Sequence, residues 1–131
     1  MLEALSRQEW VVMEALWNKS PMFLSEIMDS LNKTLPWKRG TYLTYMKRIC
    51  DKGYVDFDEI RGSRSYYPLV SREKCVQNES QLMVSKMTND SARLFLACMI
   101  TDSGLSEESS KELKELIENL AMQAEKQERE S

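Results

Sequence analysis

The sequence predicts a mainly helical protein with one small β-hairpin, on three observations. The stretch "SRQE" has the form of a helix-opening capping box, and it begins the first of several segments with helical spacing of apolar residues. Residues 55–68 instead alternate around a glycine-containing turn, as a hairpin does. The 131 residues, 42% of them hydrophobic, suffice for one ordinary domain or a small domain with an extension.

The first helix is expected to begin after Ser6 and to end near Asn18. Ser6 and Glu9 can each satisfy a backbone N–H of the other residue, and Leu5 can pack on Trp10 across the cap. A short extended piece at 22–24 and a second short helix follow, with Ser25 as the expected cap.

A third helix is expected over residues 37–52, ended by Gly53. Its two faces differ in chemistry. Helical spacing places on its buried face Tyr42, Tyr45, Met46 and Ile49. The opposite face holds Gly40, Thr41, Leu43, Thr44, Lys47 and Arg48, and the first turn adds Lys38 and Arg39.

The hairpin is expected to follow this helix directly. Val55 and Phe57 fall on one side of its first strand, and Asp56 and Asp58 fall on the other. The expected tip consists of Arg61, Gly62, Ser63 and Arg64, and Pro68 suits the end of the second strand.

Two domains are expected, over residues 1–76 and 77–131. A helix is expected to begin at Ser71, and two short helices are expected to follow with a break between them near Asn89. A last helix is expected to start near Ser106. The segment "RLFLACMI" is apolar almost all round, so it needs burial on more than one side. Residues 124–131 are expected to be solvated and frayed.

Composition argues against an enzyme. The chain has no histidine and only four glycines, which excludes histidine-based catalysis and a phosphate-binding glycine loop. The three cysteines are widely spaced, so neither a disulfide framework nor a zinc pair is expected, and no cofactor or metal is predicted. No secretory signal or apolar run of about 18 residues is present, which predicts a cytoplasmic protein.

Charge is unevenly distributed. Residues 1–76 contain 12 Lys and Arg against 10 Asp and Glu, whereas residues 77–131 contain 6 against 11. Three helices followed by a basic-tipped hairpin predict a winged helix-turn-helix, in which the third helix enters the DNA major groove. The candidate DNA-binding residues are Lys38, Arg39, Thr41, Thr44, Lys47, Arg48, Arg61, Ser63 and Arg64.

Two other functions are compatible with the same pattern. A basic helix face is often a solvated surface, and a winged helix can bind protein rather than DNA. A thiol-based sensor would use Cys50 or Cys98, although both are expected to be buried and therefore hard to oxidise.

The C-terminal half is expected to form a homodimer, because one amphipathic neighbour cannot cover the "RLFLACMI" helix. The alternative is a helical cap packed on the N-terminal domain of the same chain. The candidate dimerisation residues are Leu94, Leu96, Ile100, Leu113, Leu116, Ile117 and Leu120.

Four segments resemble the penicillinase and methicillin-resistance repressor family, which includes copper-responsive repressors. They are "LSRQEWVVMEALW", "WKRGTYLTYMKRICDKGYV", "GSRSYYPLVSRE" and "LSEESSKELKELI", within residues 4–121. The resemblance implies a homodimeric winged-helix repressor of a palindromic operator, often upstream of β-lactamase genes. By position it assigns DNA contacts to Thr41, Thr44 and Lys47 in the helix and to Arg61, Ser63 and Arg64 in the wing.

The resemblance also implies a switch. In resistance members, a membrane sensor with a metalloprotease domain responds to a β-lactam, and the repressor is then cut in a C-terminal helix. The matching region here is 94–100. The aligned pair is Ala97-Cys98, where some members carry Asn-Phe. The run of cysteines found in the copper-responsive branch has no counterpart in this sequence.

Overall fold

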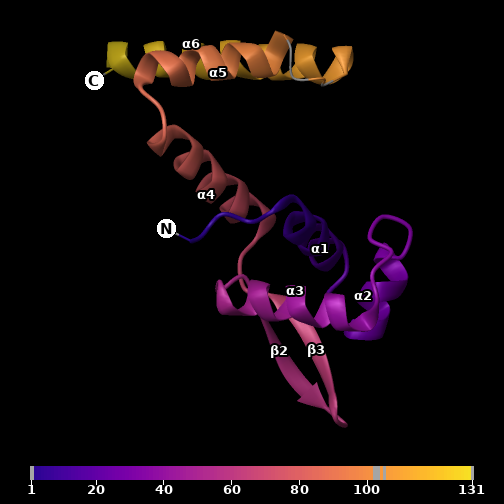
Figure 1. Ribbon diagram of the computed structural model, residues 1–131. Helices are drawn as coiled ribbons and strands as arrows, with labels where there is room; N and C mark the ends of the chain where they lie inside the picture. The colour runs from indigo at the N-terminus through magenta and orange to yellow at the C-terminus, as the bar shows by residue number, and fades with distance from the viewer. Residues whose placement is uncertain (1, 102–103, 105, 131) are drawn as a thin grey trace. The chain divides into compact units, whose positions relative to one another are not determined.

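A computed structural model describes residues 2–101, 104 and 106–130 (Figure 1). The chain divides into two compact units, residues 1–83 and residues 84–131. The first unit holds three helices, a hairpin and most of a fourth helix. Its elements are α1 (Arg7–Asn18), β1 (Met22–Phe23), α2 (Leu24–Leu31), α3 (Arg39–Asp51), β2 (Val55–Ile60), β3 (Ser63–Pro68) and α4 (Arg72–Ser85).

The predicted start of α1 is confirmed. The Ser6 N–H donates to Glu9 Oε1 at 2.8 Å, and the Glu9 N–H donates to Ser6 Oγ at 3.2 Å. This reciprocal pair satisfies two backbone donors that a helix otherwise leaves unpaired. Leu5 and Trp10 both pack against the core, as the expected contact across the cap requires.

The predicted cap of α2 is wrong. The helix begins at Leu24, directly after the strand pair of β1, so Ser25 is already helical. The Glu26 carboxylate accepts the N–H of the N-cap residue Phe23 at 3.0 Å, and no side chain of the described residues caps the N–H groups of the first turn. A carboxylate in the first turn also suits the positive end of the helix dipole.

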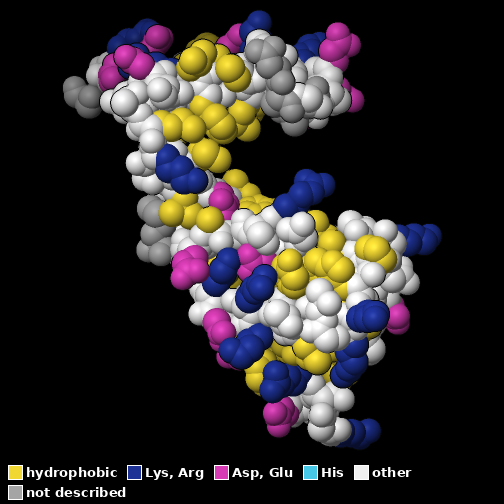
Figure 2. Space-filling model, viewed as in Figure 1, with side chains coloured by type: hydrophobic (Ala, Val, Ile, Leu, Met, Phe, Trp, Pro, Cys, Tyr) yellow, Lys and Arg dark blue, Asp and Glu magenta, His cyan; other side chains and the backbone are white. Residues whose placement is uncertain are grey.

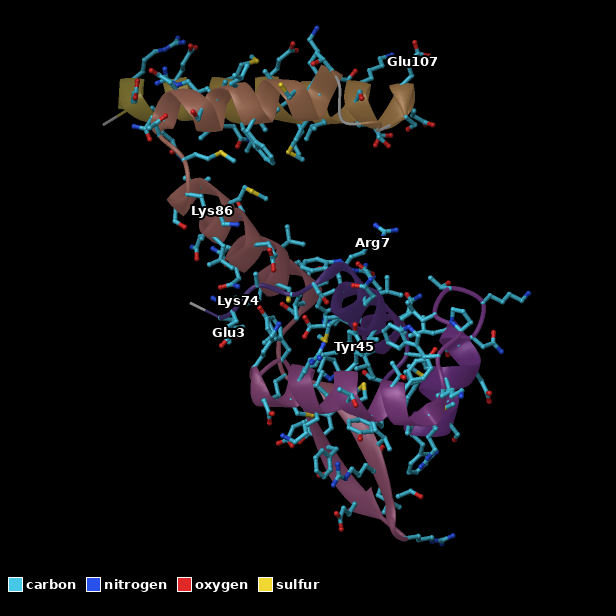
Figure 3. The ribbon with its side chains drawn as sticks, viewed as in Figure 1. Glu3, Arg7, Tyr45, Lys74, Lys86 and Glu107 are labelled. Carbon is cyan, nitrogen blue, oxygen red and sulfur yellow. The ribbon has the colours of Figure 1, made fainter. Side chains whose placement is uncertain are left out.

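The third helix, α3, begins two residues later than predicted because Lys38 is extended and caps it. Tyr42, Met46 and Ile49 are fully buried in the core, as predicted. Tyr45, labelled in Figure 3, is only half-buried. Its ring lies outside the core and stacks on the ring of Trp37, which is itself half-buried, with centroids 4.2 Å apart. Gly53 ends the helix with a φ of +88°, a conformation that glycine adopts without strain.

The hairpin has a tighter tip than the sequence predicts. Arg61 and Gly62 alone form the turn, both with positive φ, as in the two-residue turns that match strand twist. Ser63 and Arg64 therefore belong to β3 and pair with β2. The strands form a three-stranded antiparallel sheet in the order β1-β3-β2, and the hairpin projects past α3 (Figure 1).

The first unit extends along α4. The Asn78 side chain bonds both the N–H and the carbonyl of Leu2, at 3.1 and 3.0 Å. Glu79 Oε1 accepts the Leu5 N–H at 3.0 Å. The boundary predicted after residue 76 falls inside this continuous helix, and the division of roles between the two units stays a prediction.

The second unit contains α5 (Asn89–Thr101) and α6 (Glu107–Glu130), which contact each other side by side (Figure 1). Residues 86–88 separate α4 from α5, close to the predicted break. The end of the chain is exposed over residues 125–130, as expected, but the expectation that it is frayed is wrong, since α6 continues to Glu130. Its last turns are supported by an ion pair between Arg129 and Glu125, one helical turn apart.

Candidate nucleic-acid interface

The outward face of α3 is exposed along its length. Lys38 and Arg39 open it, and the exposed side chains that follow along the helix are Thr41, Leu43, Thr44, Lys47, Arg48 and Asp51. Figure 2 shows Lys and Arg side chains spread over α3 and the hairpin, with apolar surface between them. A protein that neutralises phosphates needs such exposed cations on one surface.

An open groove lies between α3 and the hairpin within the first unit. We call it the α3–wing groove; its lining residues are Arg39 and Leu43 of α3, Gly62, Ser63, Arg64 and Tyr66 of the hairpin, and Phe23, Leu24 and Ser25 where β1 meets α2. One end of α3 and the hairpin line the groove from opposite sides, although 23 positions separate Arg39 from Gly62 in sequence. Of the other candidate site residues, four lie elsewhere on the exposed surface of α3, Lys38 is the residue that caps this helix, and Arg61 belongs to the turn of the hairpin.

The exposed face of α3 has two flanks. At 3.6 residues per turn, Arg48 lies about 140° around the helix from Leu43, so the two side chains leave the helix on different sides. Arg39 and Leu43 line the α3–wing groove, whereas Thr41 and Arg48 do not. The candidate residues of α3 therefore form a broad surface, and only one part of that surface lines the groove together with the wing.

Aromatic rings hold two of the arginines. The Arg64 guanidinium lies over the Phe57 ring, 4.4 Å from its centroid, and that of Arg48 lies 5.0 Å from the centroid of Tyr45. Such contacts restrict a long side chain without neutralising its charge. Both guanidinium groups thus keep N–H donors for a phosphate or a guanine edge.

Two further candidates have partners on α3 itself. Lys47 Nζ lies 3.1 Å from Asp51 Oδ2, and both side chains are largely exposed. An exposed pair of this kind contributes less than about 1 kcal/mol, so a phosphate can replace the carboxylate at little cost. The Thr44 hydroxyl donates to the Gly40 carbonyl at 3.0 Å, which leaves its oxygen lone pairs and its methyl group for a ligand.

Sequence reasoning did not select Leu43 or Ser25 as site residues. Leu43 falls on the outward face in the sequence pattern, but an apolar side chain carries no charge signal. The signal that could have found it is a leucine on the polar side of an amphipathic helix, four residues from both Arg39 and Lys47. Ser25 gives no signal that sequence can separate from a helix cap.

The cysteines differ in environment. Burial is the main cause that raises the pKa of the Cys75 thiol to about 11, and burial together with Asp56 and Asp51 raises the pKa of Cys50. Both thiols are thereby poor nucleophiles at neutral pH. Cys98 is exposed on α5, so the expectation that it is buried is wrong for the single chain.

The described residues hold no cluster of three or more Cys, Asp and Glu side chains suited to a metal ion. No helix in the described ranges is long and apolar enough to cross a bilayer.

A three-helix unit whose third helix and β-hairpin present exposed cations together defines the winged-helix class of DNA-binding proteins. A sequence model of the family described as penicillinase repressor matches residues 5–119, so the chain belongs to that family. The resemblance inferred from the sequence is thereby confirmed. The protein is a transcriptional repressor of this family with a winged-helix DNA-binding domain.

The curated relatives are distant but cover most of the chain. The methicillin resistance regulatory protein MecI of Staphylococcus aureus strain N315 is 22% identical over 113 residues, which are 86% of this chain and 92% of MecI. The penicillinase repressor of Bacillus licheniformis is 23% identical over 114 residues, 87% of this chain and 89% of its own.

A solved structure supports the fold of the first unit. The solution structure of the DNA-binding domain of the repressor BlaI superposes with a TM-score of 0.50 at 25% identity. It covers 56% of this chain and 93% of the BlaI domain. The predicted fold class, a winged helix followed by a helical C-terminal part, is confirmed.

Proposed function

We propose that this repressor is a homodimer that binds a palindromic operator of β-lactam-resistance genes. The observation that carries DNA recognition is the α3–wing groove, where Arg39 and Arg64 face a common space from two separate elements. A duplex whose major groove takes α3 would meet the wing with its backbone or adjacent minor groove. The relatives named for methicillin resistance and penicillinase repression support the choice of regulated genes.

The second unit supports the homodimer. In the single chain, α5 has no buried residue among its described side chains. The large exposed apolar residues of the two helices are Leu94, Phe95, Leu96, Leu116, Leu120 and Met122. Of the other predicted dimerisation residues, Ile100, Leu113 and Ile117 are half-buried. A second copy related by a two-fold axis would remove this apolar surface from water.

A two-fold dimer would bind DNA more tightly than a single winged unit. One winged unit offers few contacts, so it binds weakly alone. Joining two raises the effective concentration of the second unit at its half-site and increases affinity by orders of magnitude. The operator is then expected to contain two inverted half-sites about one helical turn apart, or a multiple of that distance.

Relief of repression is proposed to follow cleavage in α5 between Ala97 and Cys98. Both side chains are exposed in the single chain. A helical peptide bond enters a protease only after local unwinding, so a membrane-bound sensor protease, directly or through another protease, would act on opened α5. A site-specific protease sequence placed across 97–98 tests this. Cutting should release bound DNA, and DNA retained by the cut protein would contradict the proposal.

The cations of α3 give the test of DNA binding. Replacing Lys47 and Arg48 with Ala is expected to weaken binding to a selected palindrome at low salt. The slope of log K against log salt should become shallower by roughly one unit for each lost phosphate contact. Fluorescence anisotropy over a series of salt concentrations measures both quantities.

Lys33→Ala is the matched control, since this exposed lysine lies after α2 and outside both α3 and the hairpin. Its slope should equal that of the unmodified protein. A winged unit that instead docks on protein would show no preference for any duplex in competition with bulk DNA. That result, or an unchanged slope in the double variant, would reject the proposed interface.

A further inference from the structure

Leu43 is an apolar side chain that lies outside the core of the first unit. It is 39% exposed and does not belong to the buried core or to the partly buried residues packed against it. Its neighbours on α3, Tyr42 and Met46, are each 1% exposed and belong to that core. Leu43 therefore keeps apolar surface in contact with solvent on the polar face of the helix, where a ligand can reach it.

The charged side chains around Leu43 are basic, although Phe23, Leu24 and Tyr66 line the same groove. Arg39 lies one turn before it and Lys47 one turn after it, and Arg64 faces it across the α3–wing groove. Cations on three sides make this surface attractive to a polyanion and unattractive to a purely apolar partner. The charge around Leu43 thus favours a nucleic acid over a protein as the ligand of this surface.

Gly40 leaves the outer side of Leu43 uncovered. The two residues are three apart, so they are neighbours on the helix surface, and helical side chains lean toward the N-terminal turn. A Cβ added at Gly40 would have no atom within 4 Å, so packing does not require glycine here. A longer side chain at this position would cover Leu43, whereas glycine keeps it open to a ligand.

We propose that Leu43 is a specificity-determining residue that contacts the C5 methyl group of a thymine in the major groove. Of the groups that the four base pairs present there, this methyl group is the apolar one. At 3.6 residues per turn, Leu43 lies at the groove-side edge of the exposed helix face, between Arg39 and Lys47. There it can meet a base edge while the cations on either side meet phosphates. The inference rests on the proposed DNA binding and adds a preference for thymine at one position of each half-site.

The experiment removes the methyl group from the DNA and the leucine from the protein. The full chain first selects duplexes from a random pool, and each thymine of a selected duplex is then replaced singly by deoxyuridine, which lacks only the C5 methyl. Affinities are measured for the unmodified protein and for Leu43→Ala. Leu69→Ala is the matched control, because Leu69 is also exposed in the first unit but lies outside α3 and the hairpin.

With the unmodified protein and the Leu69→Ala control, deoxyuridine at one thymine per half-site is expected to lower affinity about fourfold, the factor that corresponds to the burial of one methyl-sized group. With Leu43→Ala the same replacement should have no effect, because the partner of the methyl group is gone. Equal melting temperatures of the three proteins would show that the fold is unchanged.

Two results would overturn the inference alone. One is that no deoxyuridine replacement changes affinity, and the other is that Leu43→Ala keeps the full sensitivity. In both cases a preferred duplex is still selected, so the proposed repressor function stands. A pool that yields no preferred duplex would reject both the function and the inference.

Discussion

Leu96→Asp is expected to convert the protein to a monomer and to lower operator affinity by roughly 10²- to 10⁴-fold, the range by which linking two binding units increases affinity. Leu96 is 42% exposed on α5, in a unit that is proposed to be covered by a second copy. Burying an unpaired carboxylate at that contact costs far more than the leucine contributes, so association is lost. Sedimentation equilibrium and DNA binding on the same samples measure the two effects together.

Ser91→Asp provides the control for this variant. Ser91 is exposed near the start of α5 and is polar already, so a carboxylate there should leave association unchanged. The near-ultraviolet circular dichroism of the first unit should be the same in both variants, since its core lies entirely within residues 12–75. A Leu96→Asp protein that dimerises and represses normally would show that the second unit has been assigned the wrong role.

Lys52→Met is expected to destabilise the first unit by about 3 kcal/mol at pH 7, near the lower end for breaking a buried ion pair. Lys52 Nζ lies 2.8 Å from Glu9 Oε1 and 2.9 Å from the Ala4 carbonyl oxygen, which joins the end of α3 to the start of α1. Glu9 is only 2% exposed. Without the ammonium group its carboxylate would stay buried beside the cap of Ser6.

The pH dependence of this loss has a defined sign. Burial raises the pKa of Glu9, but hydrogen bonds from Lys52 and Ser6 together hold it below its ordinary 4.5. The pair therefore contributes stability above about pH 4.5, and that contribution is lost as the pH falls through the lower folded value. In Lys52→Met the hydrogen bond from Lys52 no longer opposes the effect of burial, so the pKa of Glu9 rises. Acid then no longer lowers the stability of the variant through Glu9.

Urea unfolding at pH 7 and pH 4 should accordingly show a difference between the two proteins that is larger at pH 7. The double variant Glu9→Gln, Lys52→Met removes both charges and should recover part of the lost stability. A difference that is constant from pH 7 to pH 4 would mean that the ion pair does not stabilise the fold as described.

Much of the fold could be predicted because its signals are local. The capping box at Ser6 and Glu9, the glycine that ends α3 and the alternation of β2 depend on residues close in sequence, and all three are confirmed. The cap of α2 was predicted wrongly because β1 pairs with β3, a contact that fixes Phe23 as the last extended residue. No local pattern reports a strand partner some forty residues away.

The candidate interface shows the same division. The outward cations of α3 follow from helical spacing, and their exposure agrees with it. The α3–wing groove depends on how the hairpin folds back toward Arg39, which sequence spacing does not give. The extent of the tip also could not be predicted, because Arg61 adopts a positive φ that non-glycine residues seldom take.

The hydrogen bonds between Leu2 and Asn78 join positions 76 apart in the sequence. They join the beginning of the chain to α4, so neither of these two segments can detach from the first unit without breaking its bonds to the other. Breaking these bonds leaves the side chain of Asn78 and the backbone of Leu2 without each other at the same time. Opening should therefore be a concerted event, and amide deuteration of α1 and of the start of α4 should proceed at a common rate.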